Sequence, residues 1–370
     1  MERALARSRD RFSDRHSNSA VQRPIRLMIV DDSTVARAEL SRMIESDPAF
    51  EISAVAGTAE HAIEALGECR VDIVILDLEM PGAGGLRSIP RIVAAAAGAK
   101  VMIVSSLAED GAEQTVAALA LGAADTMPKP GTGRFNGKFS EILLSKLKAL
   151  GRAPALVPQT VGPHETGAQP LLRVMPSDPI DVLAIGASTG GIHALGVLFH
   201  TLPARIGVPI LVTQHLPIPF MSVFARQLGA VACRDAVVAE DGMELLPDSI
   251  LVAPGDAHLT LDPGSRGAVV RLTHGRSSSG CMPSVDPMLA SVGAIYGPAG
   301  LGVVLTGMGR DGVEGAARLV ACGGSILAQD EASCAVWGMP RAVLEAGLAS
   351  AVLPPDKIAR RIASRTEELR

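Results

Sequence analysis

Aromatic side chains are the scarcest class in this chain of 370 residues: they make up 2% of it, with one Trp and one Tyr. Its cores must therefore be built from Ala, Val, Leu, Ile and Met, and an apolar fraction of 48% is ample for that purpose. At roughly 150 residues for each domain, the chain is long enough for two.

Long apolar runs and an excess of positive charge are also missing. No stretch approaches the ~20 apolar residues that cross a bilayer, and the N-terminus has no apolar segment typical of a secretory signal. The 34 Lys and Arg against 39 Asp and Glu give a net charge of -5, which argues against nucleic acid or an anionic membrane as partner. We therefore expect a cytoplasmic protein that does not insert into membranes.

The cysteines lack the paired spacing of metal or redox motifs. We expect reduced, mostly buried thiols and no metal site built on cysteine pairs. The five positions are Cys69, Cys233, Cys281, Cys322 and Cys334.

The first half of the chain alternates short apolar runs with amphipathic segments. Residues 1–24 are polar and Arg-rich and are predicted to be a disordered tail. Residues 25–150 then predict a parallel α/β sheet with right-handed crossovers. Strands are expected at 25–30, 50–56, 71–76, 101–104 and 124–127, and helices at 34–45 (with Ser33 as N-cap), 60–66, 109–121 and 138–150. The proline-rich residues 151–179 predict a linker.

Polar side chains follow the strands of this first sheet. Asp31 and Asp32 end the first strand, Asp77 the third and Ser105 the fourth, and Lys129 follows the fifth. The carboxyl ends of parallel strands meet at one edge of a sheet, and clustered carboxylates suit Mg²⁺.

Four short segments here resemble the receiver domain of two-component response regulators, which has a five-stranded, flavodoxin-like fold. They are Val30-Asp31-Asp32-Ser33, Leu76-Asp77-Leu78-Glu79-Met80-Pro81, Val104-Ser105 and Lys129-Pro130. The resemblance implies that Asp77 accepts a phosphoryl group from a histidine kinase and that Asp31 and Asp32 hold Mg²⁺ beside it. It makes Ser105 the switch hydroxyl and Lys129 the phosphoryl-sensing amine. Thr126 stands where the family usually has a switch aromatic, which concerns signal transmission rather than phosphorylation.

Residues 180–370 predict a second, doubly wound and mostly parallel α/β domain. A small antiparallel hairpin is expected around Asp262-Pro263-Gly264, with strands at 258–261 and 268–272. The other strands are expected at 182–185, 208–213, 236–239, 249–253, 301–305 and 325–328.

A glycine-rich turn follows the first strand of this second domain. Gly186, Ser188 and Gly190 match the G-x-S-x-G spacing of a nucleophile elbow. The same residues could form an ordinary strand-to-helix turn or a loop that cradles phosphate. The Gly-Lys-Ser/Thr sequence of a P-loop is missing, which argues against the phosphate site.

A serine nucleophile needs a base and an acid that orients it. His215 ends the strand after the serine strand, so it falls on the same sheet edge. The residues alone leave the acid open among Asp256, Asp286, Asp311 and Asp330. Asp311 follows the strand at 301–305 in a glycine-rich loop whose backbone N–H groups could serve an oxyanion.

Three segments closely resemble the catalytic domain of chemotaxis protein-glutamate methylesterases, the CheB family. They are Gly186-Ala187-Ser188-Thr189-Gly190-Gly191, Thr213-Gln214-His215-Leu216-Pro217 and Gly307-Met308-Gly309-Arg310-Asp311-Gly312. Further matches are Ala253 to Leu259, Pro283-Ser284-Val285-Asp286 and Gln329 to Arg341.

This resemblance implies a triad of Ser188, His215 and Asp311. In the glycine-rich loop beside Asp311, the Met308 N–H is our candidate for an oxyanion donor. It implies glutamyl methyl esters and certain glutamines of chemoreceptors as substrates, with no cofactor for the esterase half. In the family the receiver blocks the esterase site until it is phosphorylated. The alternative is a receiver-linked adaptor with a non-catalytic or phosphate-binding α/β domain.

Overall fold

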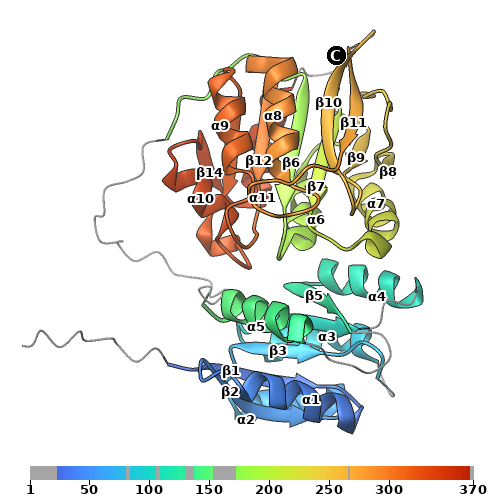
Figure 1. The fold of residues 1–370 in the computed structure, drawn as a ribbon, viewed down its shortest axis with the longest axis vertical. Coiled ribbons are helices and arrows are strands. Elements are labelled where there is room, and N and C mark those ends of the chain that lie inside the picture. Colours follow the sequence, from blue (N-terminus) through green and yellow to red (C-terminus); the bar gives the residue numbers. More distant parts are fainter. Residues whose placement is uncertain are drawn as a thin grey trace, which may run out of the picture.

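The computed structural model describes residues 23–80, 84–105, 109–129, 137–152, 172–265 and 267–366. The chain forms two α/β halves, one against the other (Figure 1). Most of the expected tail and linker lies outside the described residues. Within those residues, no helix is both long enough and apolar enough to cross a membrane.

The N-terminal half is a five-stranded parallel sheet with helices on its faces, as predicted. Its strand order is β2-β1-β3-β4-β5. Ser33 caps the first helix, since its side chain accepts a hydrogen bond from the Ala36 N–H at 3.3 Å. The strands are β1 (Ile25–Val30), β2 (Phe50–Ala56), β3 (Ile73–Leu76), β4 (Lys100–Ser105) and β5 (Asp125–Pro128). The helices are α1 (Thr34–Glu45), α2 (Ala59–Glu68), α3 (Gly85–Ala95), α4 (Glu109–Ala120) and α5 (Gly137–Arg152).

Helix α3 is absent from the sequence-based prediction. It contains Pro90 and starts after Gly84, whose φ is 73°. A proline inside a run usually argues against a helix, because it removes one backbone donor and crowds the preceding turn. Burial of Ile89 and Ile92 against the sheet stabilises the helix nevertheless.

The C-terminal half is a seven-stranded parallel sheet ordered β14-β13-β12-β6-β7-β9-β8, with the hairpin β10-β11 beside it. Only the short edge strand β14 was not predicted. The strands are β6 (Val182–Ala187), β7 (Ile210–Gln214), β8 (Ala236–Val238), β9 (Ile250–Val252), β10 (His258–Gly264), β11 (Gly267–Thr273), β12 (Gly300–Val304), β13 (Ser325–Gln329) and β14 (Ala351–Leu353). The helices are α6 (Gly191–Thr201), α7 (Ile218–Ala232), α8 (Val285–Tyr296), α9 (Val313–Ala321), α10 (Met339–Glu345) and α11 (Pro355–Ala363).

The hairpin reverses later than expected. Asp262 and Pro263 lie in β10, paired with Val269 and Ala268, and the chain turns between Gly264 and Gly267. A proline is tolerated at the edge of a two-stranded ribbon, because its missing N–H can face away from the partner strand. The Asp-Pro-Gly signal therefore marked the end of the strand rather than the turn itself.

The two halves meet where β5 and α4 face the second sheet's helices. Helix α4 packs against α6 and α7. The Gly190 N–H donates to the Ala124 carbonyl at 2.6 Å, and the Thr189 hydroxyl donates to Asp125 Oδ2 at 2.7 Å. The start of β5 is thus hydrogen-bonded to the turn that follows β6.

The cysteine prediction was wrong in part. All five thiols are free, but only Cys334 is buried. Cys233 and Cys322 are exposed at the ends of α7 and α9, where helices finish at the surface. Cys69 and Cys281 are half-buried.

Candidate active site and phosphorylation site

Ser188 follows β6, a central strand between β12 and β7. The chain turns sharply after it: the Gly191 N–H donates to the Ser188 carbonyl at 2.8 Å, and Gly190 has a φ of 78° that favours glycine. Space also requires glycine at 186, because a Cβ there would lie 2.4 Å from a methyl of Val285. The sequence thus builds a tight strand-to-helix turn that presents the serine at the sheet edge.

The Ser188 side chain is half-buried, and its hydroxyl makes no hydrogen bond within the described chain. The loop after β12 lies directly against it: a Cβ on Gly307 would come 2.7 Å from Ser188 Cβ. Met308, the next residue, is 37% exposed, and its N–H has no acceptor among the described residues. Gln214 Nε2 donates to the Ser188 carbonyl at 2.9 Å.

His215 follows β7 on the same edge and is hydrogen-bonded to Asp311. The His215 Nε2 to Asp311 Oδ2 distance is 2.8 Å. With Nε2 bonded to the carboxylate, Nδ1 remains to accept another proton. Burial disfavours the charged ring, but the hydrogen bond and charge of Asp311, together with Cys281, outweigh it and raise the His215 pKa to about 9.

Asp311 is buried and held from two further directions. The Ser284 hydroxyl donates to Oδ1 at 2.6 Å, and the Val285 N–H donates to Oδ2 at 2.7 Å. Burial opposes ionisation, yet these bonds and His215 hold the Asp311 pKa below its usual range. Of the four acids that the sequence left open, Asp311 is the one that contacts His215 in the described structure.

Ser284 is a contact that sequence reasoning missed. The segment Pro283-Ser284-Val285-Asp286 stood out, but no local pattern aims its hydroxyl at Asp311. Ser284 also caps α8, where its hydroxyl accepts from the Asp286 N–H at 3.3 Å.

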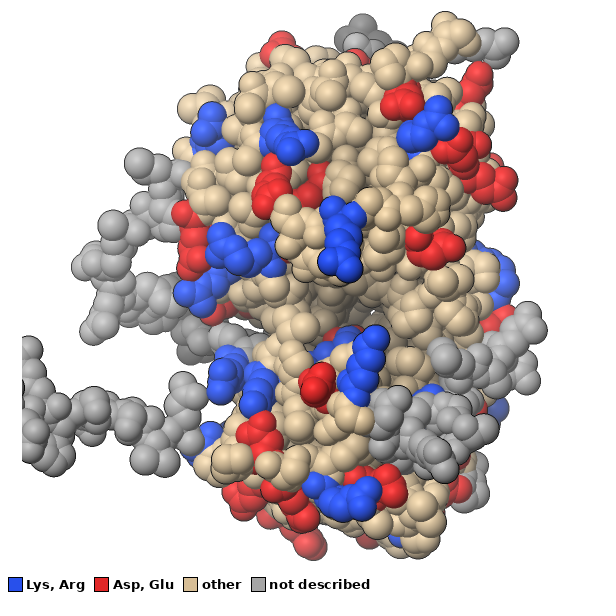
Figure 2. Space-filling model, viewed as in Figure 1, with Lys and Arg blue, Asp and Glu red and all other residues tan. Residues whose placement is uncertain are grey.

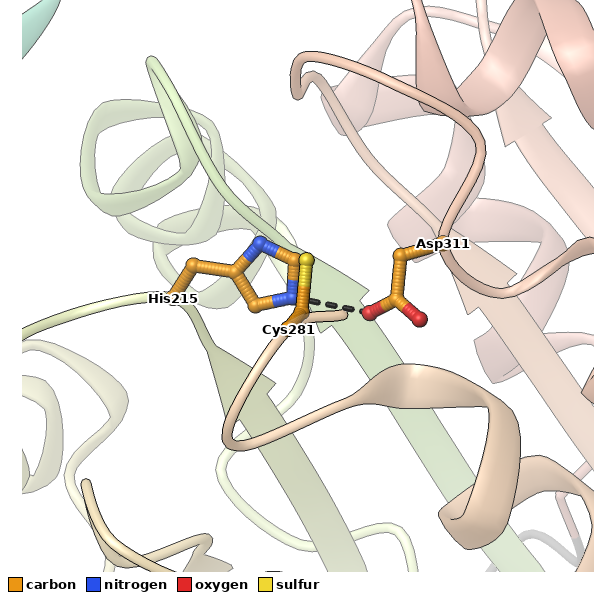
Figure 3. Close-up of side chains that lie close together, drawn as sticks. All are labelled: His215, Cys281 and Asp311. Atoms are coloured by element: carbon orange, nitrogen blue, oxygen red, sulfur yellow. Dashed lines mark hydrogen bonds and ion pairs between the residues drawn. The ribbon is translucent and has the colours of Figure 1, made fainter. Parts of the chain in front are cut away.

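Cys281 is the second unexpected neighbour. It lies in the loop before α8, and its thiol contacts the His215 ring, next to the Asp311 carboxylate (Figure 3). The ligand atoms of His215, Cys281 and Asp311 all lie within 4.8 Å of one another.

The N-terminal half gathers its own polar residues at the carboxyl edge of its sheet. Lys129 Nζ lies 2.8 Å from Asp31 Oδ2 and 2.7 Å from Asp77 Oδ2. Carboxylate oxygens of Asp31, Asp32 and Asp77 lie within 4.8 Å of one another, a donor set that suits a hard divalent cation. Burial raises the Asp77 pKa in spite of Lys129.

Two expected switch positions lie apart from this cluster. The Ser105 hydroxyl is hydrogen-bonded to that of Thr115 on α4 at 2.8 Å rather than to Asp77. Thr126 is buried, and its hydroxyl has no partner among the described residues.

Comparison with known proteins agrees with this two-part layout. A family model described as CheB methylesterase matches residues 183–362, and one described as response regulator receiver domain matches residues 27–134. A protein of Caulobacter vibrioides named "Protein-glutamate methylesterase/protein-glutamine glutaminase 2" is 42% identical over 349 residues, which cover 93% of this chain and 100% of that protein. The chain belongs to the CheB methylesterase family.

Further relatives match nearly the whole chain or its C-terminal half. "Protein-glutamate methylesterase/protein-glutamine glutaminase 1" of Paramagnetospirillum magneticum is 38% identical, covering 90% of this chain and 94% of that protein. Among solved structures, the Thermotoga maritima CheB methylesterase catalytic domain is 36% identical, with a TM-score of 0.49 over 50% of this chain and 97% of that one. The sequence-based prediction of a receiver followed by a CheB-type domain is confirmed.

Proposed function

We propose that this CheB-family protein hydrolyses glutamyl methyl esters, and deamidates particular glutamines, on the cytoplasmic domain of chemoreceptors. The observation that carries the proposal is the 2.8 Å His215–Asp311 hydrogen bond on the sheet edge that bears Ser188. A receiver-linked adaptor is disfavoured, because an adaptor has no need of a buried, fully hydrogen-bonded acid beside a histidine.

In this reaction the Ser188 hydroxyl attacks the ester carbonyl while His215 Nδ1 accepts its proton. Asp311 fixes the ring orientation through Nε2 and stabilises the positive charge that forms. The Met308 N–H, which has no acceptor in the described chain, donates to the oxyanion. His215 returns the proton to the leaving methanol, and water then hydrolyses the acyl-enzyme. With glutamine, ammonia leaves instead.

The receiver half supplies the control. The Asp77 carboxylate would accept a phosphoryl group from a histidine kinase. Asp31, Asp32 and Asp77 would hold Mg²⁺, which offsets negative charge on the transferring group when bound. Lys129 would exchange part of its ion pairing with Asp31 and Asp77 for a phosphoryl oxygen. Ser105 would leave Thr115 to reach the same group.

The receiver stands beside the esterase site in this structure. A cavity of about 360 Å³ separates β5 and α5 from the loop of His215, Leu216 and Pro217, with Phe139 and Lys146 among its lining residues. A helical receptor segment would have to displace the receiver to reach His215. Phosphorylation of Asp77 would therefore act by shifting the population toward an open arrangement.

Methanol release from methylated receptor, with and without a small phosphodonor, tests these roles. We expect Ser188→Ala to lose at least about 10³-fold in rate and the phosphodonor to stop stimulating Asp77→Asn. Wild-type rates in Ser188→Ala would refute the nucleophile assignment. Receptor binding without methanol release by the wild type would support the adaptor.

A further inference from the structure

The loop before α8 brings a thiol into the catalytic pair. His215 follows β7, Asp311 follows β12, and Cys281 belongs to neither strand, yet their ligand atoms lie within 4.8 Å of one another. Figure 3 shows the Cys281 sulfur and the Asp311 carboxylate next to the imidazole ring. The triad chemistry has no use for this sulfur.

The three donor types together suit zinc. Zn²⁺ accepts thiolate, imidazole and carboxylate ligands at about 2.0–2.3 Å in a tetrahedron, which separates donors by about 3.5 Å. His215 Nε2 and Asp311 Oδ2 stand 2.8 Å apart, and no separation in the cluster exceeds 4.8 Å. Side-chain movements of about 1 Å would complete the geometry. The receiver cluster offers oxygen donors instead, which favour Mg²⁺.

The donors are held before any metal arrives. Ser284 and the Val285 N–H fix the Asp311 carboxylate, and such outer contacts orient metal ligands. The Cys281 carbonyl accepts from Ser277, and its N–H donates to Ser279 at 3.3 Å. The His215 side chain is 17% exposed, which leaves a path for an ion.

We propose that Zn²⁺ binds His215, Cys281 and Asp311 and reversibly inhibits the esterase. The metal takes the place of the proton between Nε2 and Oδ2, so Asp311 no longer supports the ring. With Zn²⁺ on Nε2 the neutral ring carries its proton on Nδ1, so Nδ1 can no longer accept one from Ser188, and the Cys281 thiol releases its proton to solvent as it binds. The inhibition rests on the proposed esterase function, whereas the binding does not.

Metal binding to the full-length, chelator-treated protein tests the site directly. Zn²⁺ is titrated by competition with a chromophoric chelator, with excess Mg²⁺ present to occupy the receiver carboxylates. We expect one tight site, weakened at least about tenfold in Cys281→Ser. Cys322→Ser, which changes an exposed thiol at the end of α9 that is not part of the cluster, is the matched control and should bind like the wild type.

Co²⁺ gives the spectroscopic arm. The wild type should show a thiolate-to-cobalt charge-transfer band in the near ultraviolet that Cys281→Ser lacks. Persistence of the band in Cys281→Ser, or equal zinc affinity of the two proteins, would overturn the proposal. Circular dichroism and a second variant, Cys281→Ala, separate loss of a ligand from loss of the fold.

The kinetic arm compares each protein with its own zinc-free rate. Zn²⁺ should lower methanol release by the wild type and Cys322→Ser at least about tenfold more than by Cys281→Ser, and chelator should restore it. Equal inhibition of Cys281→Ser would refute the inhibitory role. If zinc binds through Cys281 but the zinc-free protein releases no methanol, the metal site stands and the esterase proposal fails.

Discussion

At the scale of single residues, the protonation state of His215 decides when the enzyme can work. Asp311 and Cys281 raise its pKa to about 9 against the opposing effect of burial, whereas a general base must be unprotonated. At neutral pH the ring therefore carries a proton in most molecules.

We expect kcat/KM for methanol release to rise with pH between about 6.5 and 9 rather than to level off near the ordinary histidine pKa. Rates measured in chelator across this window, with and without phosphodonor, check the prediction. A plateau already reached by pH 7 in both series would contradict it. The protonated ring also stabilises the folded state, because the His215 pKa is higher in the folded than in the unfolded chain. The free energy of unfolding should therefore fall as pH rises over the same window.

Ser284 acts through Asp311 and not on the substrate. We expect Ser284→Ala to lower kcat about tenfold with little change in KM, because one of the bonds that hold the carboxylate is lost. Ser284→Thr should restore part of the rate. The control is Ser291→Ala on α8, because the Ser291 hydroxyl bonds the Met288 carbonyl and no other group in the described part of the chain. An equal loss in both alanine variants would point to helix destabilisation instead.

At the scale of elements, the start of β5 is hydrogen-bonded to the turn that carries the nucleophile. Asp125 Oδ2 accepts from the Thr189 hydroxyl and pairs with Lys146 on α5, each at 2.7 Å. On the outer side of the same interface, Arg226 of α7 pairs with Glu113 of α4, but both are exposed and contribute little. The buried hydrogen bond is the stronger candidate for holding the halves together.

We expect Asp125→Ala to raise the unstimulated esterase rate up to about tenfold and to shrink the stimulation by phosphodonor. A hydrogen bond to a charged group stabilises by about 1.5–3 kcal/mol, enough to change the closed-to-open ratio by that factor. Asp72→Ala removes a comparable carboxylate bonded to Arg26 within the receiver alone, and should leave the unstimulated rate unchanged. Equal unstimulated rates in Asp125→Ala and Asp72→Ala would contradict a role of the Asp125–Thr189 bond in holding the halves together.

At the scale of the whole molecule, the surface and the interface use charge differently. The face drawn in Figure 2 carries Lys, Arg, Asp and Glu intermixed over both halves rather than a patch of one sign. Lys100, near the interface between the halves, is a buried charge without a partner in the described part of the chain. It is 4% exposed, and its ammonium makes no hydrogen bond among the described residues. It borders a cavity of about 370 Å³ that residues of both halves line, with Ala335 and Pro354 on the esterase side.

Burial lowers the Lys100 pKa to about 8, with Cys334 opposing the shift. Since the unfolded chain holds this proton up to about pH 10.5, the burial penalty is full below pH 8 and disappears as pH rises toward 10.5. Lys100→Met should therefore raise Tm by about 5 °C at pH 7. The wild-type Tm should rise from about pH 8 to 10 as Lys100 loses its proton, and the variant should lack this rise. Calorimetric scans with the exposed Lys138→Met as control check this. An unchanged Tm would mean that solvent reaches the ammonium.

Much of this protein follows from the sequence alone, because strands and helices leave local periods and parallel strands end at a common edge. That reasoning placed Asp31, Asp77 and Lys129 together, and it put Ser188 and His215 on one edge. It failed at helix α3, because Pro90 argues against a helix in the sequence, whereas burial against the sheet stabilises one in the structure.

Only the tertiary structure decided which side chains complete the site. The residue pattern left Asp311 as one acid among four, and only the family resemblance singled it out; the structure shows its hydrogen bond to His215, 96 residues away. Thr189 likewise bonds Asp125 across 64 residues. Cys281 and Ser284 enter from a loop whose path no local pattern specifies. Loop paths depend on packing of the whole domain, and a difference of about 1 Å separates a contact from a gap.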